Sequence, residues 1–385
     1  MRGRLLAAAA CFAVVIVVGS PFAGQLRAAI ASAFPGQARA IIGGGVAVAI
    51  AAALFTAVAR VRRTRGGRRD GDSVRERRTL RYFALGAALV AGMLFARALS
   101  SGDPNIDVVE DFHFVEYGIL TLLFYLAWRP FDDLSVLVLP LLAGLLVGTL
   151  DEWFQWFVPF RVGELRDILL DGAAVGCGLL FSIGVDPPGR FTLAMHRGSA
   201  IRIGAMAVVF ILVFALFFQA AFLGLDVRDP RIGVFRSRYT AAELEEAARD
   251  RSARWRGAPP PTAGRVSRED QYLTEALWHV RRRNDSVAAG DLFAAWRENR
   301  ILETFYAPVL DPPGSVDRPG FGWPAAQRAD TERRVQDDGR PYLSEAEPYR
   351  IYVWPKSRFW AAIALVLAVT IVLSVAADRR SRRLS

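Results

Sequence analysis

A short polar segment between two apolar stretches contains the residues best suited to chemistry. It runs from Asp151 to Asp167 and combines acids, an amide and arginines. Carboxylates and amides hydrogen-bond sugars or peptides, and arginine forms paired hydrogen bonds with phosphate or carboxylate groups. The same side chains also transfer protons. The composition of the segment therefore indicates either a binding site or an acid–base site.

Spacing within this segment predicts which side chains meet. Glu152 and Gln155 are three residues apart, so they share a face if the helix continues for another turn. Pro159 then ends that turn, which allows Arg161 to fold back toward the acids. We expect these polar groups to lie together.

A second pair of acids follows on the next apolar stretch. Asp167 and Asp171 are four residues apart on one helical face, so Asp171 lies about 6 Å deeper. An acid one turn inside a bilayer must be paired or neutral, which makes it a functional candidate. The expected partners of Asp171 are Arg166, Arg161 and His113.

Structural roles explain some of the same residues equally well. The rings of Trp153, Phe154, Trp156 and Phe157 are typical of an aromatic belt at a membrane surface. Arg161 would close the loop structurally if it paired with Glu152 or Asp167. His113 by itself is typical of a membrane-interface residue.

Composition indicates a mixture of membrane spans and a soluble part. The chain has 385 residues, of which 53% are hydrophobic, and a formal charge of +10. Much of the positive charge is arginine beside apolar segments, where it sets membrane topology, so we expect no nucleic-acid partner. Both cysteines lie in apolar segments and there is no CxxC or HExxH motif, so we expect no disulfide, metal or cofactor.

Eight apolar runs are close to the roughly 20 residues that a membrane-spanning helix needs. They cover residues 5–23, 40–59, 82–99, 112–129, 134–150, 168–185, 203–225 and 359–377. The first is interpreted as an uncleaved span, with a cleaved signal peptide as the alternative. The predicted fold is an all-α polytopic membrane protein with eight transmembrane helices.

Eight spans place both termini in the cytoplasm. The two most basic segments, residues 60–81 and the C-terminal tail, then also lie in the cytoplasm, as the positive-inside rule requires. The predicted domains are two N-terminal spans (1–60), a four-helix core (81–185), the seventh span (203–225), an extracytoplasmic domain (226–358), and the last span with its tail (359–385).

The domain of residues 226–358 is expected to be mainly helical. Thr240 and Glu243 have the spacing of a capping box, and a second helix is predicted to open at Ser267. A third follows over residues 291–306, and residues 349–354 are the one predicted strand.

The residues at the ends of the central spans resemble two family motifs. His113-Phe-x-x-Tyr117-x-x-Leu120 is similar to the first motif of the VanZ-like family of small bacterial membrane proteins. The second motif resembles Glu152-x-x-Gln155-x-Phe157-x-Pro159-x-Arg161, followed by Asp167. The resemblance covers residues 81–185.

This chain departs from the family pattern at two places. It lacks the lysine that commonly precedes the histidine, and it has Asp171 where asparagine is common. Three glycines, Gly172, Gly176 and Gly178, keep the small-residue character that allows helices to pack closely. The resemblance implies a protein of the bacterial inner (plasma) membrane and does not define a reaction.

Two hypotheses of function follow. In the preferred one, a non-catalytic envelope protein binds an amphiphile at the outer face: a lipid-linked cell-wall precursor, a glycopeptide or a lipid head group. The binding candidates are His113, Tyr117, Glu152, Gln155, Arg161, Asp167 and Asp171. In the alternative, an integral-membrane enzyme acts on such a lipid, with His113 as base and Glu152 or Asp167 as acid. Transport or signalling through a proton relay at Asp171 is a third possibility.

Overall fold

The computed structural model describes residues 2–63, 71–100, 102, 104–157, 163–189, 191–230, 232–256, 268–311, 321–335, 341–345 and 350–384. The chain forms two compact units. Unit 1 comprises Met1–Gln155, Val162–Ala215 and Ile363–Ser385, and unit 2 comprises Trp156–Arg161 and Leu216–Ala362.

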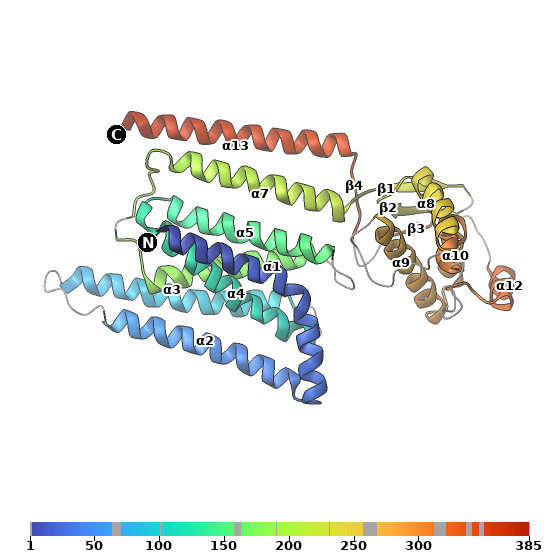
Figure 1. Ribbon diagram of the computed structural model, residues 1–385, viewed down its shortest axis with the longest axis horizontal. Helices are drawn as coiled ribbons and strands as arrows, with labels where there is room; N and C mark the ends of the chain where they lie inside the picture. Colours follow the sequence, from blue (N-terminus) through green and yellow to red (C-terminus); the bar gives the residue numbers. More distant parts are fainter. Residues whose placement is uncertain are drawn as a thin grey trace. The chain divides into compact units, whose positions relative to one another are not determined.

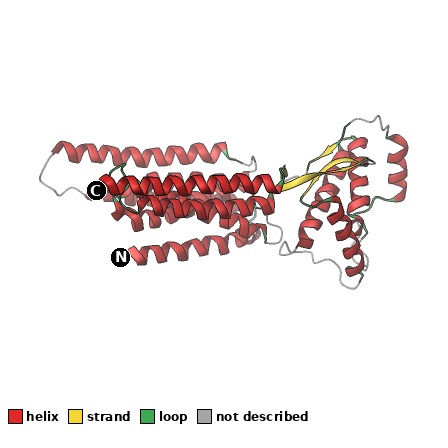
Figure 2. Ribbon diagram, turned by 90° about the horizontal axis from the view of Figure 1, so that it is seen from above, coloured by secondary structure: helices red, strands yellow, loops and turns green. Residues whose placement is uncertain are grey.

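Unit 1 is built from long helices that lie side by side (Figures 1 and 2). They are α1 (Arg2–Ala33), α2 (Ala38–Arg63), α3 (Gly71–Ala98), α4 (Pro104–Trp128), α5 (Ser135–Trp156), α6 (Leu165–Val185) and the greater part of α7 (Ser199–Ala221) and α13 (Lys356–Leu384), with a 3₁₀ turn, η1 (Arg129–Phe131). The helix α1 turns sharply partway along its length (Figure 1). The part of α1 that is long and apolar enough to cross a membrane is Arg2–Ser20.

Seven of the described helices, α1, α2, α3, α5, α6, α7 and α13, are long and apolar enough to cross a membrane. Helix α4 is not among them, because it contains more polar residues, including His113 and Glu116. Its middle is nevertheless enclosed by other helices, since Tyr117, Leu120 and Tyr125 are buried. The core of unit 1 joins α4 to α1, α5 and α6.

Glycines allow these central helices to approach closely. A Cβ atom at Gly144 of α5 would lie 2.5 Å from a Val175 methyl group of α6. A Cβ at Gly178 of α6 would lie 2.9 Å from the Cα of Gly118 on α4, which confirms the predicted role of Gly178. At Gly172 the nearest atom would be a Leu145 methyl at 3.0 Å, whereas at Gly176 no atom lies within 4 Å. Gly176 therefore has no such packing role.

One end of unit 1 is basic and contains both chain termini (Figures 1 and 2). The guanidinium groups of Arg2 and Arg202 both lie over the ring of Phe131 there. Asp133, just before α5, accepts hydrogen bonds from the backbone N–H of Ser135 at 3.0 Å and of His196 at 2.7 Å. Burial alone would raise the pKa of Asp133, but its hydrogen bonds lower it below the ordinary value.

Unit 2 contains a four-stranded sheet, which the sequence analysis did not predict. The strand order is β3-β2-β1-β4, with β1 (Leu223–Asp229), β2 (Gly233–Ser237), β3 (Leu343–Ser344) and β4 (Tyr352–Val353). Strands β1 and β2 are antiparallel, whereas β1–β4 and β2–β3 are parallel pairs. Only β4 lies within the single predicted strand.

The predicted seventh span was wrong at its C-terminal end. Helix α7 stops at Ala221, and Leu223 to Leu225 belong to strand β1 rather than to the span. These residues are apolar, so hydropathy continues across the boundary. Their backbone groups pair with β2 and β4, which the local sequence does not reveal.

Five helices complete unit 2: α8 (Ala241–Arg254), α9 (Arg268–Ala288), α10 (Leu292–Phe305), α11 (Ala307–Leu310) and α12 (Ala325–Arg334). The capping box of Thr240 and Glu243 is confirmed at the start of α8. Helix α10 matches the helix predicted over residues 291–306, with Asp291 as its N-cap. Ser267 lies outside the described residues.

The core of unit 2 also encloses paired charges. Arg238 lies 2.9 Å from Glu275, which also accepts a hydrogen bond from Ser237 at 2.6 Å. His279 Nδ1 lies 2.7 Å from Glu298 Oε2. Burial opposes ionisation of Glu298, but His279 and the hydroxyl groups of Ser344 and Tyr342 lower its pKa below the ordinary value.

Candidate functional site

Three buried carboxyl groups meet at the end of unit 1 where α5 ends and α6 begins. Asp151 and Glu152 come from the last two turns of α5, and Asp171 comes from the second turn of α6. Each is 0% exposed, and one oxygen from each lies within 4.8 Å of the others. We call these three residues the acid cluster.

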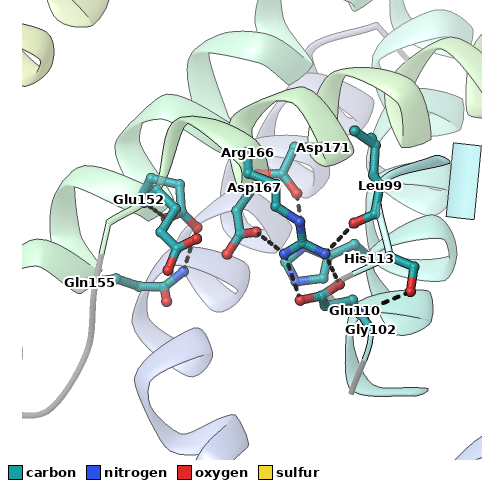
Figure 3. Close-up of polar contacts among 11 residues, drawn as sticks. Leu99, Gly102, Glu110, His113, Glu152, Gln155, Arg166, Asp167 and Asp171 are labelled. Atoms are coloured by element: carbon teal, nitrogen blue, oxygen red, sulfur yellow. Dashed lines mark hydrogen bonds and ion pairs between the residues drawn. The ribbon is translucent and has the colours of Figure 1, made fainter. Parts of the chain in front are cut away.

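Gln155 and one backbone amide hold two members of the acid cluster. The Gln155 side chain donates to Glu152 Oε1 at 2.8 Å and to Asp151 Oδ2 at 3.3 Å. Figure 3 shows the Glu152 and Gln155 side chains turned toward each other. The backbone N–H of Glu164 donates to Glu152 Oε2 at 2.8 Å. The predicted shared face of Glu152 and Gln155 is therefore confirmed.

The third member of the cluster is paired with a histidine. His113 Nδ1 lies 2.8 Å from Asp171 Oδ1, so the predicted partnership of these two residues is confirmed. Helix α4 begins at Pro104, so His113 lies in its third turn, deeper than the helix start at which it was expected. One turn further along, the Tyr117 ring stacks on the His113 ring, with 5.9 Å between centroids.

A second polar group, which we call the rim, lies beside the acid cluster and is partly exposed. It consists of Glu110 and His113 from α4 and Arg166 and Asp167 from α6. Arg166 donates to Glu110 Oε1 at 2.8 Å and to Asp167 Oδ1 at 3.2 Å, and it also donates to the Leu99 carbonyl (Figure 3).

Arg166 therefore holds α3, α4 and α6 together at this end. The prediction that it pairs with Asp171 was wrong, since its guanidinium contacts Glu110 and Asp167. Asp167 likewise lies at the rim and is not part of the acid cluster. Glu110 was not among the predicted site residues. Its position one helical turn before His113 is the signal that would have identified it.

Three buried oxygen atoms of the acid cluster and its neighbour Tyr117 form no hydrogen bond of ordinary length among the described residues. They are Asp151 Oδ1, Asp171 Oδ2 and the Tyr117 hydroxyl. A buried polar atom without a partner is costly, so such atoms often indicate a missing ion, water or ligand. No arginine or lysine among the described residues forms an ion pair with the acid cluster.

An apolar groove of about 780 Å³ lies beside the rim, between α2, α3, α4 and α6. Its walls are mostly aliphatic, with Phe114 and Phe181 as aromatic contributions. Three charged residues line it: Arg60 from the last turn of α2, Arg97 from the last turn of α3, and Asp111 from α4. Arg97 is two residues from Leu99, whose carbonyl accepts from Arg166, so one end of the groove adjoins the rim.

Some predicted features have a different or undetermined position. Pro159 and Arg161 lie outside the described residues. Of the four rings interpreted as an aromatic belt, Phe154 and Phe157 are exposed but Trp156 is buried. The groove was missed altogether, because its lining comes from four separate helices with no common sequence motif.

The described geometry supports two kinds of chemistry. The rim and the groove together present charge beside an apolar surface, and the acid cluster with Tyr117 presents unpaired oxygen ligands. Comparison of the chain with protein-family models, curated proteins and solved structures found no match.

Proposed function

We propose that this chain is a VanZ-like integral membrane protein of the bacterial cell envelope that binds an amphiphilic ligand. The groove receives the apolar chain of the ligand, and the rim with Arg97 and Asp111 receives its polar head group. The observation that supports this most directly is the groove itself. Its volume of about 780 Å³ is within the roughly 300–1,000 Å³ typical of ligand pockets.

The head group in this proposal is a phosphate-bearing lipid head, either of a phospholipid or of a lipid-linked cell-wall precursor. Arg97 is exposed and supplies positive charge beside the apolar groove. Arg161 remains a proposed additional contact. Glu152, Gln155 and Asp171 are too deeply buried to contact a head group directly, so their role is to position the rim through His113 and the backbone of Glu164.

The proposed topology has eight spans: the seven apolar helices and, in addition, α4. Its 25 residues correspond to about 37 Å of helix, enough to cross the apolar layer. Both termini lie at the same end of unit 1, which an even number of crossings explains (Figure 1). The basic end is cytoplasmic by the positive-inside rule. Residues 226–358 are then extracytoplasmic, and the rim lies at the outer face.

The topology is tested with a membrane-impermeant maleimide on intact bacterial cells, using single cysteines introduced after Cys11 and Cys177 have been replaced by alanine. Ala289→Cys lies in the exposed turn after α9, and Gly189→Cys lies in the exposed connector after α6. We expect labelling of Ala289→Cys in intact cells, and of Gly189→Cys only after cell lysis. Labelling of Gly189→Cys but not of Ala289→Cys in intact cells would show that the topology is the reverse of the proposed one.

Ligand binding is tested by filling the groove. Gly118 lines it, and a Cβ atom there meets nothing within 4 Å, so Gly118→Leu adds bulk without a clash at Cβ. Gly86 of α3 is the matched control, because it is equally open but does not line the groove. The assay is crosslinking of the purified full-length protein to a photoactivatable phosphatidylglycerol in nanodiscs.

Wild type and Gly86→Leu should crosslink equally, and Gly118→Leu should lose most of the signal. Equal crosslinking of all three proteins would contradict the proposal. Competition identifies the source of the head group. Unlabelled undecaprenyl pyrophosphate displaces the probe if the ligand is a cell-wall precursor carrier, whereas only unlabelled phosphatidylglycerol displaces it if the ligand is a phospholipid.

A second candidate function is favoured by the hydrogen bond between His113 and Asp171. A histidine oriented by a carboxylate and partly open to solvent is the usual arrangement of a general base. An enzyme would then act on the lipid held in the groove. Turnover of undecaprenyl pyrophosphate that His113→Ala abolishes, with crosslinking retained, would favour this candidate over pure binding.

A further inference from the structure

The acid cluster concentrates negative charge that the surrounding described residues do not balance. Asp151, Glu152 and Asp171 are 0% exposed, and His113 is their one ion-pair partner among the residues that the structure describes. The C-terminal end of α5, which contributes two of the acids, adds negative potential of its own. Ionised carboxylates that are buried without compensation are strongly unfavourable.

Tyr117 provides a second and independent observation. Its side chain comes from α4, is fully buried, and has a hydroxyl group that forms no hydrogen bond among the described residues. The hydroxyl faces the acid cluster, because Asp171, Asp151 and Glu152 all act on it electrostatically. Two carboxylate oxygens, Asp151 Oδ1 and Asp171 Oδ2, are also unpaired.

We propose that Asp151, Glu152, Asp171 and Tyr117 form a binding site for one hard divalent cation, such as Mg²⁺, Mn²⁺ or Ca²⁺. All four side chains offer oxygen atoms, which these ions prefer, whereas zinc and copper sites usually include nitrogen or sulfur. One oxygen from each of the three acids lies within 4.8 Å of the others, so one divalent cation can compensate their negative charge.

The contacts around the cluster match those that orient metal ligands. Gln155 donates to Asp151 Oδ2 and Glu152 Oε1, the Glu164 amide donates to the other oxygen of Glu152, and His113 contacts Asp171 Oδ1. These bonds leave Asp151 Oδ1 and Asp171 Oδ2 free for the ion. Groups that orient ligands in this way typically change metal affinity by about 10–100-fold when removed.

A bound ion would join α4, α5 and α6 at this end of unit 1. Its role would be structural support of the rim, since His113 connects the ion site to the partly exposed groups. The site does not depend on the groove, because none of its four residues lines it. The cation proposal therefore stands or fails separately from the proposed ligand binding.

The test uses full-length protein, stripped with a chelator in detergent and titrated with Mn²⁺, whose bound fraction is measured by electron paramagnetic resonance. We expect one Mn²⁺ per chain, displaceable by Mg²⁺ or Ca²⁺. Asp171→Asn should reduce binding to background. Tyr117→Phe removes only a hydroxyl group, and should weaken binding by at least about tenfold with helix content unchanged.

Asp133→Asn is the matched control. Asp133 is also a buried carboxylate beside α5, but its oxygens are hydrogen-bonded at the basic end. The Asp133→Asn variant should leave Mn²⁺ binding unchanged. Gly118→Leu, which blocks the groove, should also leave it unchanged. Absence of stoichiometric binding in the wild type would overturn the proposal and indicate carboxyl groups neutralised by protons. Binding that Tyr117→Phe and Asp171→Asn leave unchanged would place the ion elsewhere and equally overturn it.

Discussion

Replacement of Gly148 by alanine tests the contact on which the acid cluster depends. Gly148 lies on α5 directly opposite Asp171 of α6. A Cβ atom at this position would lie 2.8 Å from Asp171 Oδ2, 2.9 Å from its Cβ and 3.3 Å from its Cγ. The carboxyl oxygen could turn away, but the Asp171 Cβ moves only if the α6 backbone moves.

The magnitude follows from two opposing effects. Overpacking a close helix contact costs about 1–3 kcal/mol. Alanine in place of glycine within a helix stabilises the folded state by up to about 1 kcal/mol through its higher helix propensity. Gly176→Ala gains the same helix propensity but meets no atom within 4 Å, so it isolates the packing effect. We expect Gly148→Ala to be less stable than Gly176→Ala by about 1–3 kcal/mol.

The assay is equilibrium unfolding of the purified full-length protein in mixed micelles of a mild detergent and increasing sodium dodecyl sulfate. Helix content is followed by circular dichroism, and the two variants are compared under identical conditions. A difference of less than about 0.5 kcal/mol, within the usual range of neutral substitutions, would refute the close approach of α5 and α6.

Three further predictions concern unit 2, each measured by urea unfolding of the full-length protein followed by circular dichroism. Because the pKa of Glu298 is lowered, the stabilising effect of its carboxylate is fully present above the ordinary pKa of 4.5 and is lost as the pH falls through the lowered pKa. The wild type should therefore lose stability in acid more steeply than Glu298→Gln. Parallel profiles of unfolding free energy against pH for the two proteins would contradict this. Arg238→Ala leaves Glu275 buried without its partner and should cost about 3–5 kcal/mol, whereas a loss below 1 kcal/mol would mean that the other hydrogen bonds of Glu275 suffice. Thr240→Ala removes the capping box of α8 and should cost about 0.5–2 kcal/mol, with Thr240→Ser as the variant that restores it.

Features that depend on neighbouring residues in the sequence were predictable. The shared face of Glu152 and Gln155 and the capping box of Thr240 follow from the geometry of one helix, and the structure contains both. Seven of the apolar runs became helices long enough to span a membrane, because hydrophobic length is a property of the local sequence. The eighth apolar run lies in α4, which is not among these seven helices because its polar residues lower its hydropathy.

The sheet of unit 2 was not predictable in the same way. Strands β3 and β4 have only two residues each, so their sequences contain no alternating pattern. Strand β1 is apolar at its start and continues the hydropathy of α7 without a break. Strands β1 and β2 form a hairpin with each other, but β3 and β4 exist only because strands far away in the sequence supply their hydrogen bonds.

By itself, the sequence singled out a set of candidate polar residues: His113, Tyr117, Glu152, Gln155, Arg161, Asp167 and Asp171. The tertiary structure decided how they divide. Both aspartates lie on one face of α6 but at different depths, so Asp171 meets His113 and the acid cluster, while Asp167, one turn earlier, meets Arg166 at the rim. The close approach at Gly148 then brings the two aspartates of the cluster, from separate helices, within 4.8 Å. Spacing along one helix defines a face, but only packing against other helices defines what that face meets.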